Sequence, residues 1–137
     1  MRPGGDHDLS GRWSGLYNYP DGGPPTIFEA DLRESAGLLT GTTTELADSG
    51  DLYGQTIGAV IDGRRVGSSV AFLKMYDGAS PDHDVVRYEG ALDPDGNEIE
   101  GIWIIPEIWS GTFLMMRARA EQVEKEAEIE EKVPFGR

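Results

Sequence analysis

The chain has 137 residues, no cysteine and a formal net charge of −13 at pH 7. This length suits one domain with a real core, and the absence of cysteine excludes a disulfide framework and a thiolate metal site. An acidic chain repels phosphate backbones and anionic lipid headgroups, so nucleic acid and membrane surfaces are not expected as partners. The charge indicates either a soluble acidic surface or a surface for a basic protein.

The hydropathy pattern gives no reason to expect a membrane segment. No apolar run approaches the ~18 residues of a membrane-spanning helix, and the first residues lack the apolar core of a secretory signal. We therefore expect a cytoplasmic protein.

Three regions follow from composition. Residues 1–8 are rich in Gly and Asp and are expected to be a disordered tail. Residues 9–119 carry the strand patterns and form the expected single domain. Residues 120–137 include six glutamates between Glu121 and Lys132, which predicts an acidic helix or a disordered tail. The apolar stripe of that segment is thin, so the helix is either solvated or covers a barrel end or a partner.

Alternating apolar and polar residues predict about eight strands in chain order. The clearest pattern is in the second, where Phe28, Ala30 and Leu32 alternate with charged residues. The meander over 85–119 contains a proline- and glycine-rich turn at 94–97, and Asp62-Gly63 predicts another turn. The expected strands cover residues 9–19, 26–34, 38–45, 55–61, 66–76 and 85–92, one from Glu98 that ends at Pro106, and 109–119.

Strands of similar length joined by short connections, without an intervening helix, indicate an all-β fold. We predict an antiparallel up-and-down β-barrel of about eight strands, followed by a short C-terminal helix or tail. A barrel of this strand number is just filled by side chains or holds one small ligand.

Gly11-Arg12-Trp13 in the first strand and Arg117 or Arg119 at the end of the last form a pattern that resembles the calycin group of lipocalins and avidins. In that group the indole closes one barrel end and a basic side chain stacks across it, as the attraction between a guanidinium and an indole face allows. The order of elements looks closest to the avidins, with similar runs at 38–42 and from 88 to 103. The resemblance covers about residues 9–118.

The residues for biotin, however, are not carried over. Gly15 and Tyr19 stand where avidins place polar groups, Phe72-Leu73-Lys74 stands where a Trp-Lys would be expected, and the last strand lacks the family's aspartate. The resemblance therefore implies an avidin-like barrel without the biotin site. No cofactor is expected.

A ligand in such a barrel would enter at the open mouth and contact inward aromatic rings and a few polar groups. The alternative is that these rings simply fill the core. The candidate ligand-binding residues are Tyr17, Tyr76, Tyr88, Trp103 and Trp109, with Ser68 and Thr112 as polar partners.

Two sequence features point only weakly to chemistry. The tripeptides Asp6-His7-Asp8 and Asp82-His83-Asp84 contain the only histidines and could offer ligands to a divalent metal, but no metal site is assigned. Glu89, Glu98 and Glu100 form an acidic patch that an outward strand face would leave solvated rather than tuned for acid–base work. Without a nucleophile motif or a phosphate-binding loop, no catalytic residue is assigned.

The last two strands are apolar on both faces. Ile102 and Ile104 alternate with Trp103 and Ile105, and Leu114 and Met116 with Phe113 and Met115. A closed barrel buries only one face, so the second face predicts a homo-oligomer or a C-terminal segment that folds back.

Two functions remain open from the sequence. The first is a non-enzymatic calycin-like protein that holds a small, largely apolar ligand in the barrel. The second is a structural or adaptor module with a filled barrel, acting through homo-oligomerisation and an acidic surface. A cavity with convergent hydroxyls would favour the first, and a packed interior the second.

Overall fold

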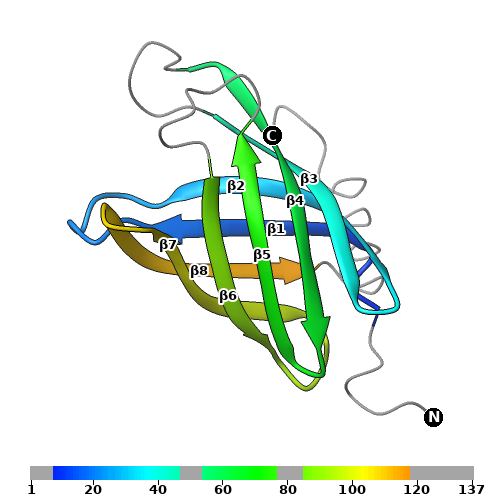
Figure 1. Cartoon of the computed structure of the whole chain (residues 1–137). Coiled ribbons are helices and arrows are strands. Elements are labelled where there is room, and N and C mark those ends of the chain that lie inside the picture. The colour runs from blue at the N-terminus through cyan, green and yellow to red at the C-terminus, as the bar shows by residue number, and fades with distance from the viewer. Residues whose placement is uncertain (1–7, 47–53, 77–84, 118–137) are drawn as a thin grey trace, which may run out of the picture.

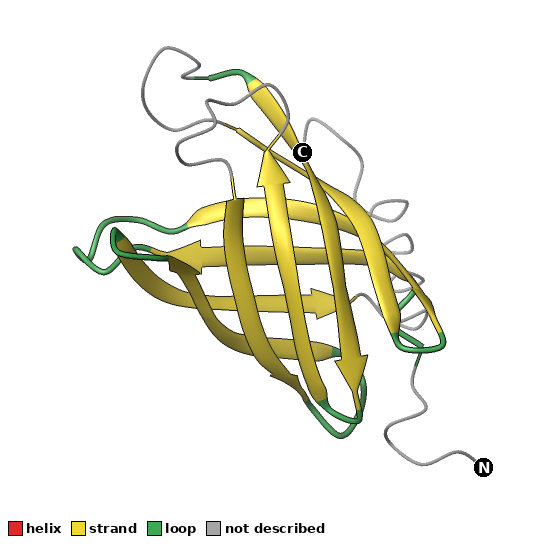
Figure 2. Ribbon diagram, viewed as in Figure 1, coloured by secondary structure: helices red, strands yellow, loops and turns green. Residues whose placement is uncertain are grey.

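The computed structural model describes residues 8–46, 54–76 and 85–117, which form a closed antiparallel barrel of eight strands (Figures 1 and 2). Each strand pairs with the next, and β1 pairs with β8 to close the barrel. The predicted fold class is therefore confirmed, whereas the acidic segment 120–137 lies outside the described residues. The strands are β1 (Gly11–Asn18), β2 (Thr26–Ser35), β3 (Leu38–Leu46), β4 (Thr56–Val66), β5 (Ser69–Tyr76), β6 (Val85–Leu92), β7 (Glu98–Ile105) and β8 (Trp109–Arg117).

The two-residue period of the sequence decides which side chains fill the barrel. In β2, Phe28, Ala30 and Leu32 are buried while the residues between them are exposed. The same alternation holds in β6, where Val86 and Tyr88 point inward. One apolar face per strand therefore makes one continuous core, as the side-chain geometry of a pleated sheet requires.

The predicted turn at Asp62-Gly63 is wrong. β4 continues through these residues to Val66, and the chain reverses at Gly67, whose φ is +60°. Gly63 is instead a position where two strands approach closely, because an added Cβ would lie 2.1 Å from the carbonyl oxygen of Ala71. Asp-Gly therefore occurs here inside a strand, where glycine meets a packing need rather than a turn.

One end of the barrel is closed by Trp13, which is fully buried. Its indole N–H donates to the carbonyl oxygen of Leu9 at 2.9 Å, and the Arg117 guanidinium lies 4.7 Å from its ring centroid. Arg117 also donates to the carbonyl oxygens of Asp8 and Gly96, each at 2.6 Å. The predicted pairing of Trp13 with a basic residue is thus present with Arg117, while Arg119 lies outside the described residues.

A second ionic contact ties strands together at the same end. Arg65 donates to Glu34 at 2.8 Å, and the same carboxylate oxygen accepts from the backbone N–H of Leu9 at 2.9 Å. Arg65 further donates to the carbonyl oxygen of Gly67. These contacts join β2, β4 and the segment that precedes β1.

Candidate functional site

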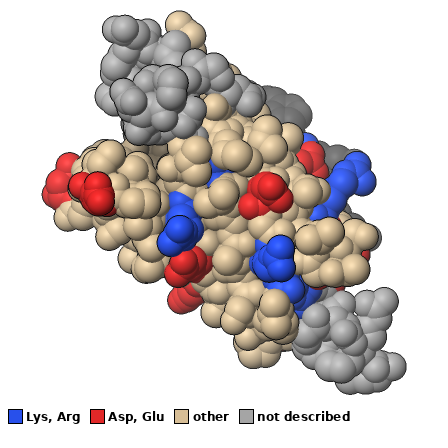
Figure 3. Space-filling model, viewed as in Figure 1, with Lys and Arg blue, Asp and Glu red and all other residues tan. Residues whose placement is uncertain are grey.

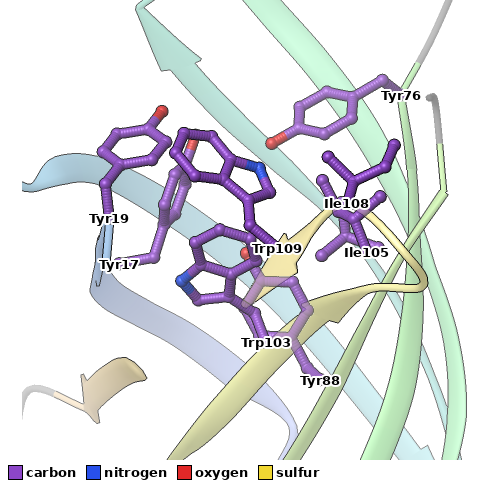
Figure 4. Close-up of a pocket in the computed structure, with 9 residues that line it drawn as sticks. Tyr17, Tyr19, Tyr76, Tyr88, Trp103, Ile105, Ile108 and Trp109 are labelled. Carbon is purple, nitrogen blue, oxygen red and sulfur yellow. The ribbon is translucent and has the colours of Figure 1, made fainter. Parts of the chain in front are cut away.

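A cavity of about 450 Å³ opens at the end of the barrel opposite Trp13. Figure 4 shows the side chains that line it. This volume falls in the range of small-molecule pockets in proteins. Its apolar aliphatic lining comes from Val86, Ile105 and Ile108. Its aromatic lining comes from Tyr17, Tyr19, Tyr76, Tyr88, Trp103 and Trp109.

The aromatic rings pack edge to face and form one side of the cavity. Trp103 and Trp109 are almost perpendicular, with ring planes at 89° and centroids 5.9 Å apart. Tyr19 packs edge to face on Trp103, with centroids 6.1 Å apart, and on Tyr17, at 5.5 Å, while Tyr17 and Trp103 are in edge contact with each other at 6.1 Å. Such contacts satisfy the ring quadrupoles and hold the ring faces in fixed directions.

Strand ends and one tight turn position these rings. β1 ends at Asn18, whose carbonyl oxygen accepts from the indole N–H of Trp103 at 2.9 Å. Glu107 adopts a left-handed φ of 66° in the turn between β7 and β8, and this turn carries Ile108 to the cavity. Tyr76 lies across the cavity from Tyr17 and Tyr19 (Figure 4), and its hydroxyl is directed to Glu45.

Beneath the rings lies a buried ion pair. Nζ of Lys74 donates to Oε1 of Glu45 at 2.8 Å, and Lys74 is fully buried. The ammonium lies over four aromatic rings, at centroid distances of 4.4 Å for Phe28, 4.9 Å for Tyr17 and 5.0 to 5.6 Å for two further tyrosines. Carboxylate and ring faces together replace the water that a buried cation loses.

Glu45 collects hydrogen bonds from the cavity wall. The hydroxyl of Tyr17 donates to Oε2 of Glu45 at 2.6 Å, and the hydroxyl of Tyr76 lies 3.2 and 3.3 Å from its two oxygens. The hydroxyl of Tyr88 accepts from Nζ of Lys74 at 3.5 Å. The network therefore connects three of the rings that line the cavity to the buried pair.

Burial dominates the ionisation of these groups. Loss of hydration raises the pKa of Tyr17, Tyr76 and Tyr88, and the nearby Glu45 carboxylate raises them further. Burial lowers the pKa of Lys74, an effect that the Glu45 carboxylate opposes. Each tyrosine accordingly keeps its proton, and with it one hydrogen-bond donor.

The structure brings together most of the residues predicted from the sequence. Tyr17, Tyr76, Tyr88, Trp103 and Trp109 all line the cavity. Tyr19 also lines the cavity. In the sequence it stands where avidins place a polar group for biotin, and it was not predicted as a ligand-binding residue. The cavity thus gathers rings from five strands and one loop into one site.

The two predicted polar partners do not face the cavity. Ser68 is exposed in the turn between β4 and β5, at the closed end of the barrel, because β4 runs four residues beyond Asp62. Thr112 is exposed on the outer face of β8, where it accepts from the side-chain amide of Asn18 at 2.9 Å. It points outward because its neighbour Phe113 points inward.

Glu45 and Lys74 were missed as site residues, although the sequence carries a signal for them. Lys74 is in phase with Val70 and Phe72, and Glu45 is in phase with Leu39 and Thr43, all of which are buried. A charged residue at an inward position of a strand indicates a buried partner. The partner could not be identified, because strands β3 and β5 are not adjacent.

The described residues contain no group of three or more histidine, aspartate or glutamate side chains placed to hold a metal ion. The histidines of both Asp-His-Asp tripeptides lie outside the described residues. In the part of the chain that the structure covers, no helix is long and apolar enough to cross a membrane.

The fold and the site together define an eight-stranded antiparallel barrel with one sealed end and one aromatic cavity. Comparisons of the chain with protein-family models, with curated proteins and with solved structures found no match.

Proposed function

We propose that this protein is a non-enzymatic binder of a small, largely apolar molecule, which it holds in the open end of the barrel. The supporting observation is the cavity of about 450 Å³ with aromatic walls and tyrosine hydroxyls near its floor. An apolar lining with a few placed polar groups is typical of ligand pockets. A filled barrel, which the adaptor function would require, leaves no such space.

The sealed end strengthens the likeness to calycin barrels on which the proposal partly rests. Trp13 and Arg117 occupy the positions that the resemblance assigns to them, with the guanidinium 4.7 Å from the ring centroid. Kinship with the avidins or lipocalins stays part of the proposal. Biotin is not the proposed ligand, because Phe72 and Tyr88 stack at 4.9 Å inside the barrel and take space below the cavity.

The proposal is tested with N-phenyl-1-naphthylamine, a neutral apolar dye whose emission rises in apolar sites. We expect a saturable rise with one site per chain. The variant Ile105→Trp should abolish it, because Ile105 lines the cavity and a larger ring would fill the space. Thr112→Val, on the outer face, is the matched control and should bind like the wild type.

Dye binding that survives Ile105→Trp would place the dye outside the cavity and contradict the proposal. Native mass spectrometry of freshly purified protein adds an independent measurement. A co-purified small molecule on the wild type, absent from Ile105→Trp, would support the proposal and give the mass of the ligand.

A further inference from the structure

Two hydroxyl groups at the cavity floor have a fixed direction of hydrogen bonding. Tyr17 and Tyr76 each have one hydroxyl proton, and each donates it to Glu45. The oxygen–oxygen distance is 2.6 Å for Tyr17 and 3.2 to 3.3 Å for Tyr76. A carboxylate accepts hydrogen bonds and cannot return one. Both tyrosines line the cavity, and a hydroxyl that donates its proton to Glu45 can act toward a further partner only as an acceptor.

Lys74 maintains this arrangement. Its ammonium donates to Oε1 of Glu45 at 2.8 Å and to the hydroxyl of Tyr88 at 3.5 Å, and it has no exposed surface. The positive charge of Lys74 is therefore compensated by the Glu45 carboxylate and by the ring faces around it, and Lys74 does not line the cavity. Together Lys74 and Glu45 add no net charge to the floor.

The cavity wall is also better suited to a cation than to an anion. None of the described side chains that line it is charged, so an anionic group would find no positive partner. The remaining hydrogen-bond donors of its lining are neutral: the hydroxyls of Tyr88 and Tyr19, whose oxygens accept from Lys74 and Thr26, and the indole N–H of Trp109. By contrast, the ring faces carry negative potential and attract ammonium groups.

The barrel interior already holds an ammonium in this manner. Nζ of Lys74 lies 4.4 Å from the centroid of Phe28 and 4.9 Å from that of Tyr17. The chain's net charge of −13 further favours the approach of cations at low salt.

From these observations we infer that the ligand is an apolar amine, with a protonated nitrogen directed to the Tyr17 and Tyr76 oxygens and an aromatic or aliphatic body between the Trp103 and Trp109 rings. This inference rests on the proposed binding function and names the ligand class. Glu45 acts as a positioning residue, because it sets the polarity of the two hydroxyls and does not itself line the cavity.

The test compares three probes of similar shape and different charge on the full-length protein at pH 7. They are 2-phenylethylamine, 2-phenylethanol and 3-phenylpropanoate, titrated by isothermal calorimetry at about 0.15 and 0.5 M salt, where surface electrostatics are progressively screened. We expect the amine to bind at least about tenfold more tightly than the propanoate at both salt concentrations, as expected for charge-assisted hydrogen bonds.

Two variants test the route of recognition. Tyr76→Phe keeps the ring and removes one acceptor, and should weaken amine binding about three- to tenfold, while Thr112→Val should leave it unchanged. The double variant Glu45→Gln with Lys74→Met keeps the volumes and removes the fixed acceptor polarity, so it should reduce the preference for the amine.

The outcomes separate the two claims. Equal or tighter binding of the propanoate or the alcohol would overturn the amine inference and leave the binding function standing. A preference that vanishes at high salt and ignores Tyr76→Phe would also overturn it, because net charge alone would explain the result. Binding of none of the three probes would count against the binding function itself.

Discussion

At the scale of single residues, the barrel contains an ion pair that is buried in its interior. Lys74 and Glu45 bury opposite charges among aromatic rings, 2.8 Å apart, and three tyrosine hydroxyls complete their hydrogen bonding. Desolvation of two ions costs several kcal/mol each, so such a pair stabilises a fold only weakly against an apolar substitute. Its clear structural effect is to fix the hydroxyls of Tyr17 and Tyr76 as donors to Glu45.

The energetics of the pair can be measured by a double-mutant cycle. Lys74→Met alone leaves a buried carboxylate without its cation and should lower the free energy of unfolding by about 3 to 5 kcal/mol. Adding Glu45→Gln should recover much of that loss, because both charges are then gone. Urea denaturation of the four proteins measures this coupling, and additive losses would contradict it.

The tyrosines of the network predict how stability depends on pH. An unfolded tyrosine loses its proton near pH 10, whereas burial, with a smaller contribution from the Glu45 carboxylate, keeps Tyr17, Tyr76 and Tyr88 protonated in the fold. The stability they contribute is present below about pH 10 and is lost as pH rises above it, by about 1.4 kcal/mol per pH unit and group. The lowered pKa of Lys74 acts oppositely, raising stability with pH up to about pH 10.4 and not beyond.

This prediction is checked by following tyrosinate absorbance and ellipticity together during an alkaline titration. Three of the five tyrosines should ionise only as the barrel unfolds. Reversible ionisation of all five near pH 10, with the fold intact, would show that the network does not shield them.

At the scale of elements, the seal of the closed end depends on the last residue of β8. Arg117 stacks on Trp13 and donates to three backbone carbonyl oxygens, those of Asp8, Ser10 and Gly96. Arg117→Ala should therefore lower the free energy of unfolding by about 2 kcal/mol. Arg87→Ala is the control, because its ion pair with Glu89 is exposed and 4.0 Å long, and it should change stability by less than about 0.5 kcal/mol. Equal effects in chemical denaturation would contradict the role given to Arg117.

How far the sequence predicts this fold differs from element to element. The alternation in β2 and β6 predicts which side chains are buried because one pleated face must meet the core. The β4–β5 turn could not be placed by composition, since Asp62-Gly63 resembles a turn and only the close approach of Ala71 explains the glycine.

The candidate site shows the same division. Rings such as Tyr17 and Trp103 were predicted because they share a phase with core residues. The contact between Glu45 and Lys74 is a tertiary one across the barrel, which strand periodicity cannot specify. Ser68 and Thr112 were chosen for their hydroxyls rather than their phase, and both are exposed away from the cavity.

At the scale of the whole molecule, the barrel has a sealed end, an open end and an outer surface of mixed character. On the face shown in Figure 3, basic and acidic side chains are interspersed rather than gathered into one patch of a single sign. That face gives no support to an acidic docking surface. The outer faces of β7 and β8, by contrast, carry exposed apolar side chains, since Ile102 is 44% and Met116 46% exposed there.

Because these exposed apolar residues could be covered by a second copy of the chain, homo-oligomerisation stays a prediction. We expect light scattering coupled to size exclusion to give a multiple of the chain's mass, with Ile102→Arg shifting the protein to a monomer because a charge cannot be buried without a partner. Thr44→Arg, exposed on β3, is the control and should leave the mass unchanged. A strict monomer at high concentration would contradict this prediction and leave the cavity unaffected.

The cavity itself is tested most directly by the indole N–H signals of the three tryptophans in a ¹H–¹⁵N spectrum. Trp103 and Trp109 line the cavity, while Trp13 lies at the sealed end and serves as an internal control. On titration with N-phenyl-1-naphthylamine, the neutral apolar dye, the signals of Trp103 and Trp109 should move together and saturate while that of Trp13 stays fixed. Three unmoved signals, or a shift centred on Trp13, would contradict a ligand site at the open end of the barrel.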